Sequence, residues 1–131
     1  MTAKVLFTGK THNTSGRDGG VSSSDGRLNI KVAQPHPAAE QFFGAAWSTC
    51  FMAAIEVAAA ERKVALPADP AIDAEIDLNL DNGAYFLRAR LNVAIPGVER
   101  ELAQTLVEAA HEICPYSKAT RGNIDVEITL V

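Results

Sequence analysis

The residues best suited to covalent chemistry in this sequence are its two cysteines, Cys50 and Cys114. A thiolate is a strong nucleophile, and two thiols that lie close together can form a disulfide during a redox cycle. Free cysteine is also among the most buried residue types, so two inert core thiols are the simpler interpretation when only residue types are considered. A permanent disulfide is disfavoured in a reducing compartment. Inert thiols and redox chemistry both remain open at this point.

The surroundings of Cys50 decide whether its thiol can react at neutral pH. The residue lies in a run without charged side chains, between Glu40 and Glu56. Burial in such a run raises the pKa of a thiol above its usual value of about 8.5. A nearby cation is therefore needed to stabilise the thiolate.

Arg17 is the candidate cation, because it lies in the glycine-flanked turn Gly16–Gly19, and such loops can approach a buried helix closely. A guanidinium about 4 Å from the sulfur contributes roughly 4 kcal/mol at an effective dielectric constant of about 20, and one pKa unit corresponds to about 1.4 kcal/mol. One arginine can therefore outweigh moderate burial. The simpler interpretation is a solvated turn arginine, since spacing alone does not bring Arg17 to Cys50.

Cys114 begins the segment Cys-Pro-Tyr-Ser that ends at Ser117, which is not a CxxC redox motif. If the helices that carry Cys50 and Cys114 pack together, their Cα atoms can approach the separation of ~5.5 Å that a disulfide needs. A buried thiol at a helix end is the simpler interpretation of Cys114.

Other classes of function lack their basic elements. The three histidines, His12, His36 and His111, have no metal-ligand spacing, so we expect no metal site, and we expect no cofactor. Motifs for nucleotide binding, serine hydrolysis and zinc proteolysis are absent. With 21% charged residues and a net charge of -4, the chain offers no electrostatic surface for nucleic acid or for an anionic membrane.

The length of 131 residues predicts a single domain over residues 1–131. Met1 to Lys10 lack the apolar core of a signal peptide, so we expect a cytoplasmic protein.

The residues from about Ala38 to Lys63 predict one long helix that is apolar on nearly every face. A helix of this kind must be buried all round, and one sheet of so small a chain covers only one side. We therefore expect a second subunit to cover the other side.

Alternating apolar residues predict the strands. We expect strands at Ala3 to Thr8, Leu28 to Val32, Ile72 to Leu80, Tyr85 to Ile95 and Ile124 to Leu130, a loose hairpin within Gly9 to Arg27, a tight turn at Asp81 to Gly83, and a second helix from Glu99 to Cys114. Pro115 ends that helix. The order of these elements predicts an α+β fold.

Eight ordered segments carry a family resemblance. They are Lys4 to Thr8, Gly16 to Gly19, Ser23 to Gly26, Glu40 to Phe43, Cys50 with Phe51, Lys63 to Asp69, Cys114 to Ser117 and Ala119 to Asn123. With these segments the chain resembles the organic hydroperoxide resistance proteins, a branch of the osmotically inducible protein C (OsmC) family, over nearly its whole length.

The resemblance implies an OsmC-like fold in which long central helices are wrapped by antiparallel sheets in an intertwined homodimer. It implies a peroxidatic cysteine at Cys50, a resolving cysteine at Cys114, an activating arginine at Arg17 and a carboxylate at Glu40 that orients the arginine. The implied substrates are alkyl and fatty-acid hydroperoxides, and the implied reductant is a lipoylated protein or another dithiol.

Four aromatic side chains are available to bind the alkyl tail of such a substrate: Trp47, Phe42, Phe43 and Phe51. Core packing is an equally simple role for each. Trp47 stands where the family commonly has a tyrosine, and the segment Ala33 to Ala39 is shorter than usual. Both differences predict a modified substrate pocket.

Glu40 precedes Cys50 by ten residues, which is about 15 Å along a straight helix and about 80° around it. The carboxylate therefore cannot serve its own Cys50 directly. Either the helix begins later and the chain folds back, or the carboxylate comes from the partner subunit, which is the arrangement we favour.

Two other functions fit the same residues. One is a thiol redox sensor that turns over slowly, and the other is a non-catalytic dimeric module that binds an apolar ligand. Steady-state turnover of peroxide separates both from a peroxidase.

Overall fold

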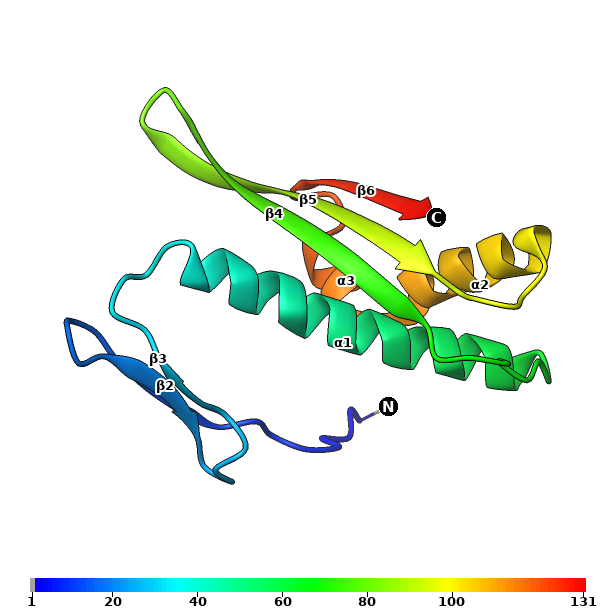
Figure 1. Cartoon of the computed structure of the whole chain (residues 1–131), viewed down its shortest axis with the longest axis horizontal. Coiled ribbons are helices and arrows are strands. Elements are labelled where there is room, and N and C mark those ends of the chain that lie inside the picture. The colour runs from blue at the N-terminus through cyan, green and yellow to red at the C-terminus, as the bar shows by residue number, and fades with distance from the viewer. Residues whose placement is uncertain (1) are drawn as a thin grey trace. The chain divides into compact units, whose positions relative to one another are not determined.

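The computed structural model describes residues 2–131, and Figure 1 shows their helices and strands. The chain forms two compact units, Met1–Ala39 and Glu40–Val131. The prediction of one domain over residues 1–131 stays a prediction.

The first unit is a small antiparallel sheet of three strands in the order β1-β2-β3. The strands are β1 (Thr11–Thr14), β2 (Gly20–Ser23) and β3 (Asn29–Lys31). The predicted hairpin and the strand near Leu28 to Val32 are thus confirmed, although β3 is shorter than expected.

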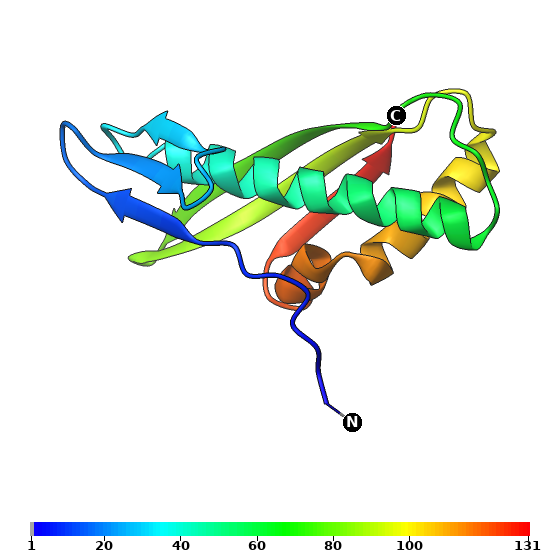
Figure 2. The same ribbon diagram turned by 90° about the horizontal axis from the view of Figure 1, so that it is seen from below.

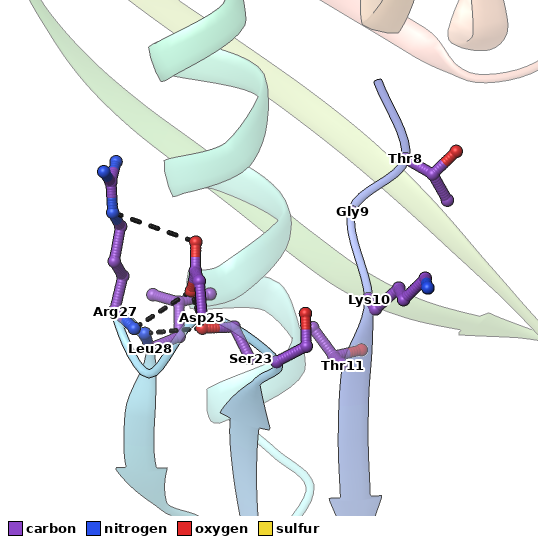
Figure 3. A pocket seen from close by; sticks show the side chains of 9 residues that line it. Thr8, Gly9, Lys10, Thr11, Ser23, Asp25, Arg27 and Leu28 are labelled. Atoms are coloured by element: carbon purple, nitrogen blue, oxygen red, sulfur yellow. Dashed lines mark hydrogen bonds and ion pairs between the residues drawn. The ribbon is translucent and has the colours of Figure 1, made fainter. Parts of the chain in front are cut away.

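A polar turn joins β2 to β3, and Figure 3 shows it beside Lys10 and Thr11, where β1 begins. The Asp25 carboxylate accepts hydrogen bonds from the Ser23 hydroxyl at 2.6 Å and from the Arg27 backbone N–H at 3.0 Å. The hydrogen bond from Ser23 is the main reason that the pKa of Asp25 lies below its usual value, and the bond from the Arg27 backbone lowers it further. The turn lines a shallow cavity of about 340 Å³ with Lys10 and Thr11.

The predicted strand Ala3 to Thr8 is not formed, and the first strand begins at Thr11. A strand needs a neighbour for its backbone hydrogen bonds, and in the first unit β1 pairs with β2 alone. Val5, Leu6 and Phe7 are exposed, and 89% of the accessible surface of Phe7 faces solvent. The alternation of side chains was therefore insufficient to make a strand here.

The second unit contains the long helix α1 (Ala38–Glu61) from Glu40 onward and a sheet of the order β4-β5-β6. β4 (Ala71–Asp81) and β5 (Ala84–Ala94) form the predicted hairpin. Its turn residues Asn82 and Gly83 have φ values of 51° and 76°. A two-residue turn in which both residues have positive φ matches the twist of the flanking strands. Asn and Gly adopt positive φ more readily than other residues, which explains the Asn-Gly pair at this point.

β6 (Asp125–Leu130) pairs with β5 in parallel, so the expected all-antiparallel sheets need this correction. The physical reason is the connection between the two strands. The chain leaves β5, passes through α2 (Arg100–Ile113) and α3 (Pro115–Thr120), and returns in the direction of β5.

Pro115 ends α2 as predicted, but it also begins α3, which the sequence interpretation did not include. Proline fits the first position of a helix because its missing N–H would have no partner there. At the other end of α2, the Glu99 carboxylate accepts from the backbone N–H groups of Glu101 and Leu102. Since α2 ends at Ile113 and α3 begins at Pro115, Cys114 is the single residue between the two helices.

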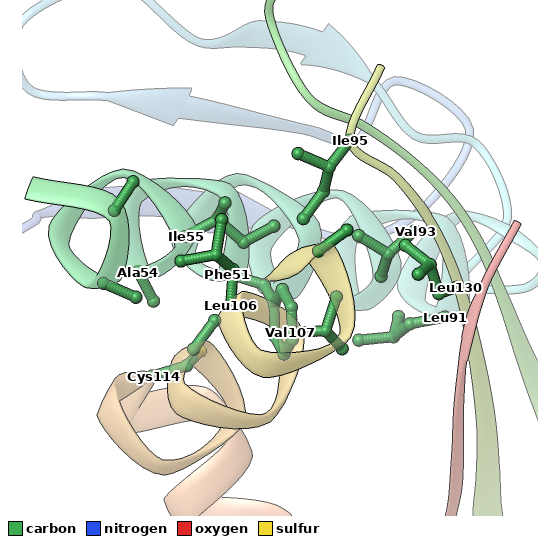
Figure 4. Packing of buried hydrophobic residues seen from close by; sticks show 14 of the residues in the cluster. Phe51, Ala54, Ile55, Leu91, Val93, Ile95, Leu106, Val107, Cys114 and Leu130 are labelled. Atoms are coloured by element: carbon green, nitrogen blue, oxygen red, sulfur yellow. The ribbon is translucent and has the colours of Figure 1, made fainter. Parts of the chain in front are cut away.

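In the second unit the helices lie on one face of the sheet, as Figures 1 and 2 show for α1, α2 and α3. Between the helices and the sheet lies the core, part of which Figure 4 shows. It includes Trp47, Phe51 and Ile55 of α1, Leu91 and Val93 of β5, Leu106 and Val107 of α2, and Cys114. The α+β class is confirmed.

The outer face of the sheet is polar and is joined by ion pairs between strands. The Arg90 guanidinium of β5 binds both carboxylate oxygens of Asp77 at 2.8 Å and one oxygen of Glu75 at 2.8 Å. Arg88 pairs with Asp125 of β6 at 3.4 Å. These arginines connect β5 to both of its neighbouring strands.

Among the described helices, α1 has the length and the mean hydropathy, 1.4, to cross a membrane. The core helix of a globular protein satisfies the same criterion. Here one face of α1 lies in the core.

Candidate active site

The structure brings the two cysteine side chains together. Cys50 lies in α1 and is half-buried, whereas Cys114 lies between α2 and α3 and is 0% exposed. Both are free thiols, and the Cys114 side chain is a hydrogen-bonding neighbour of Cys50. In Figure 4 the Cys114 side chain lies beside Phe51 and Leu106 in the core. The arrangement places one partly accessible sulfur next to one enclosed sulfur.

Burial raises the pKa of the Cys50 thiol, as the apolar sequence around it predicts. The neighbouring Cys114 thiol raises the pKa of Cys50 further, through the hydrogen bond between the two side chains and through the repulsion between two negative sulfurs. Only the backbone N–H of Tyr116 opposes them, because its hydrogen bond favours the thiolate. These four causes include no positive charge, so the thiolate of Cys50 still requires a cation.

Arg17 lies in the exposed turn between β1 and β2. Gly16 has φ 93°, and a Cβ on Gly19 would lie 2.5 Å from the backbone oxygen of Thr14, so glycine is required at both places. The conformation of the turn that carries Arg17 therefore depends on these two glycines. Because Arg17 belongs to the first unit and Cys50 to the second, their approach stays a prediction.

Glu40 lies in the first turn of α1, which begins at Ala38. The alternative in which the helix begins after Glu40 is therefore wrong. Ten helical residues separate Glu40 from Cys50, which corresponds to about 15 Å along the axis. Within one chain the structure does not bring these two side chains together.

The four aromatic candidates differ in burial. Trp47 and Phe51 are fully buried, while Phe42 and Phe43 are half-buried. The rings of Phe43 and Trp47 meet edge to face, with centroids 5.8 Å apart and an angle of 80° between the planes. Packing accounts for the burial of Trp47 and Phe51, and a role in substrate binding stays a prediction for all four.

One contact near the cysteines was absent from the sequence interpretation. The Trp47 indole Nε1–H donates a hydrogen bond to the Ser117 hydroxyl at 3.2 Å, and both side chains are buried. The positions offered one signal, since Trp47 precedes Cys50 by three residues and Ser117 follows Cys114 by three.

His111 of α2 lies against Phe51, with ring centroids 6.5 Å apart. Burial, and then the positive charge of Arg121, lower the pKa of His111. The Arg121 guanidinium also donates to the His111 backbone oxygen at 2.6 Å, which joins the end of α3 to α2. Residues 2–131 contain no cluster of three or more potential metal-ligating side chains.

A further cavity, of about 260 Å³, lies between α2 and β6 and is lined by Gln104, Val107, Glu108, His111, Val126 and Ile128. Another, of about 330 Å³, lies at Tyr85 to Leu87 and Asn123 to Asp125. Neither is lined by a cysteine, so the thiol pair and these cavities are separate features.

Comparison with known proteins places the chain in a family. Residues 32–129 match the family described as OsmC-like protein. An organic hydroperoxide resistance protein of Xanthomonas axonopodis pv. citri is 39% identical and covers 97% of this chain and 96% of its own. The organic hydroperoxide resistance protein OhrB of Bacillus subtilis is 38% identical and covers 96% of this chain and 98% of its own.

Solved structures agree. The crystal structure of Bacillus subtilis OhrB has a TM-score of 0.84 at 39% identity and covers 97% of this chain and 100% of that one. An organic hydroperoxide resistance protein from Elizabethkingia anophelis has a TM-score of 0.86 at 36% identity, with 98% of each chain covered. The resemblance found in the sequence is thus confirmed, and the chain belongs to the OsmC-like family, in its organic hydroperoxide resistance branch.

Proposed function

We propose that this protein is a cysteine-based peroxidase that reduces organic hydroperoxides, with Cys50 as the attacking thiolate and Cys114 as the resolving thiol. The observation that carries the proposal is the adjacency of two free thiols, one half-buried and one fully buried. The names of the relatives support the substrate class.

In the first step the Cys50 thiolate attacks the terminal oxygen of the hydroperoxide. The O–O bond breaks, the alkoxide takes up a proton and leaves as an alcohol, and Cys50 becomes a sulfenic acid. The sulfur loses two electrons and the peroxide gains them. The half-buried position of Cys50 supports this role, since the sulfur that meets the substrate must be reachable.

In the second step the Cys114 thiolate attacks the sulfur of the sulfenic acid. An S–S bond forms, the S–O bond breaks, and the hydroxide leaves with a proton as water. Enclosure of Cys114 beside Cys50 supports this role, because the Cys114 thiol needs to reach only its neighbour.

A dithiol then reduces the disulfide and becomes a disulfide itself, which returns both cysteines to thiols. A lipoyl group on a protein is the reductant that we expect. This cycle requires no metal and no cofactor.

The Cys50 thiolate needs a positive charge, because burial and the Cys114 thiol both raise the pKa of Cys50. We assign that charge to Arg17 and its orientation to Glu40. Since Glu40 lies about 15 Å along α1 from Cys50 of its own chain, we assign the carboxylate to a second copy of the chain.

A homodimer is supported by the apolar surface that the chain exposes. One face of α1 presents small, uncharged side chains at intervals of four residues, Ala45, Thr49, Ala53 and Val57, and all four are exposed. Small side chains permit two helices to approach closely, and exposed apolar patches mark interaction sites. We therefore propose that α1 packs against α1 of a second copy. We also expect the protein in the cytoplasm, without a nucleic-acid or membrane partner.

The test is stopped-flow oxidation by cumene hydroperoxide and tert-butyl hydroperoxide, compared with hydrogen peroxide, on the wild type and on Cys50→Ser. We expect faster reduction of the organic peroxides and no reduction by Cys50→Ser. Turnover with a dithiol reductant must continue over many cycles. Oxidation that stops after one cycle would indicate a redox sensor, and no peroxide consumption would indicate a binding module.

A further inference from the structure

A buried hydrogen bond lies beside the cysteine pair and connects the same two parts of the chain. The Trp47 indole N–H of α1 donates to the Ser117 hydroxyl of α3 at 3.2 Å. Trp47 lies one helical turn before Cys50, and Ser117 lies three residues after Cys114. The Trp47–Ser117 contact and the Cys50–Cys114 contact are thus two neighbouring links between α1 and the joint of α2 with α3.

Water cannot replace this hydrogen bond, since Trp47 and Ser117 are both 0% exposed. The loss of the acceptor would leave the indole N–H buried without a partner, which is unfavourable. The contact therefore favours the observed position of α3 relative to α1.

Cys114 depends on that position. The backbone of Cys114 is extended, with φ -65° and ψ 120°. Cys114 is both the C-cap of α2 and the N-cap of α3. Its side chain makes no capping hydrogen bond to α3, which is only six residues long. A residue at such a joint follows the orientation of the helices on each side, and α3 is the shorter of the two.

We propose that Trp47 and Ser117 are positioning residues for the resolving step, because their hydrogen bond keeps the Cys114 sulfur within reach of an oxidised Cys50. This inference rests on the proposed function. The peroxide step uses the Cys50 sulfur and not the Cys114 sulfur, so it depends on the position of α3 less directly, through the Tyr116 backbone N–H that favours the thiolate. Formation of the disulfide requires Cys114 to meet a sulfenic acid on α1.

Two reactions compete for the sulfenic acid. Attack by Cys114 forms the disulfide and releases water, whereas attack on a second hydroperoxide oxidises the sulfur to a sulfinic acid and releases a second alcohol. A looser joint slows the first reaction alone. The contact would therefore protect Cys50 from irreversible oxidation.

The first experiment compares Ser117→Ala with Ser48→Ala. Ser48 is the matched control: it lies in α1, is 7% exposed, and its hydroxyl has no hydrogen-bond partner among residues 2–131. One equivalent of cumene hydroperoxide is mixed with each protein, and quenched samples are resolved by mass spectrometry into thiol, sulfenic acid, disulfide and sulfinic acid.

In Ser117→Ala we expect disulfide formation to slow about fivefold, the equivalent of about 1 kcal/mol, and the peroxide step to slow less, because α3 acts on that step through the Tyr116 backbone N–H. Sulfinic acid should then accumulate at excess peroxide. Ser48→Ala should match the wild type in both steps. Equal slowing of both steps in Ser117→Ala, or an unchanged rate of disulfide formation, would overturn the proposal.

A second experiment does not require peroxidase activity. A glutathione redox buffer measures how readily Cys50 and Cys114 form a disulfide in the wild type, Trp47→Phe, Ser117→Ala and the double variant. Each single variant should lower that equilibrium about fivefold, and the double variant should lower it no further, because both changes remove one hydrogen bond. If the decrease in the double variant equals the product of the two single decreases, the two residues do not act through one shared hydrogen bond and the proposal is wrong. If the wild type consumes no peroxide but this pattern holds, the proposed function fails and the positioning role survives.

Discussion

Heterodimers that combine a Glu40→Ala protomer with a Cys50→Ser protomer would show whether one active site is built from two chains. α1 is a continuous helix from Ala38, so Glu40 and Cys50 of one chain are ten helical residues apart. This spacing is about 15 Å along the axis and about 80° around it, far beyond the length of a glutamate side chain. In the proposed dimer the two-fold axis is perpendicular to the two α1 helices, so they run antiparallel and Glu40 of one chain comes toward Cys50 of the other.

The expected activity follows from counting sites. In the heterodimer, one site combines an intact Cys50 with an intact Glu40, and the other site lacks both. Purified heterodimers should therefore have about half of the wild-type activity, and a random mixture of the two variants about a quarter. Both parent homodimers should be inactive.

The assay measures consumption of cumene hydroperoxide with a dithiol reductant, on heterodimers purified through a different tag on each chain. The matched control pairs a wild-type protomer with a protomer that carries both substitutions. That heterodimer should be inactive if sites are shared, because each of its sites lacks one partner. If the control has half of the wild-type activity and the first heterodimer has none, Glu40 acts within its own chain and the shared arrangement is wrong.

Three further predictions concern the thiols. Cys114→Ser should complete one peroxide reduction and then hold Cys50 as a sulfenic acid, which a second peroxide would oxidise to a sulfinic acid, whereas Cys50→Ser should reduce none. Single-turnover kinetics with mass spectrometry measures both, and loss of the first turnover in both variants would contradict the assigned roles. Arg17→Ala should raise the pKa of Cys50, because burial would then oppose the thiolate without a counter-charge, so its peroxide step should become faster as pH rises and be slow at neutral pH. An unchanged ultraviolet thiolate titration in folded Arg17→Ala would remove Arg17 from the site. A disulfide reagent should modify Cys50 in native Cys114→Ser but modify Cys114 in Cys50→Ser only after denaturation, since Cys114 is fully buried; equal rates in the native variants would contradict the assignment.

Much of the fold could be predicted because its patterns are local. Short stretches of sequence were sufficient to predict three features: the helix α1 from its uncharged run, the strands β4 and β5 from their alternation, and the turn at Asn82-Gly83. The segment Ala3 to Thr8 shows the limit of this reasoning, because a strand depends on a partner that its own sequence does not name. The direction of β6 was missed for the same reason, since alternation identifies a strand but not its neighbour.

The candidate site was predictable in its residue types and not in its contacts. Cys50 and Cys114 could be named from the sequence, but their adjacency results from packing of α1 against the helices that follow β5. The Trp47–Ser117 bond joins residues 70 positions apart, so the spacing of each residue from its nearest cysteine could suggest the pair but not the bond itself. Pro115 was recognised as the end of α2, yet the same proline begins α3 and so determines where Cys114 lies.

The place of the two cysteines along the chain has a consequence for the stability of the protein. A bond between Cys50 and Cys114 would close a loop that contains the end of α1, the whole β4–β5 hairpin and α2. Cross-linking a loop of this length lowers the entropy of the unfolded chain, which favours the folded state by about 4 kcal/mol in the chain-entropy model. The oxidised protein would then melt at a higher temperature than the reduced one, and each reduction by a dithiol would return the chain to its less heat-resistant form.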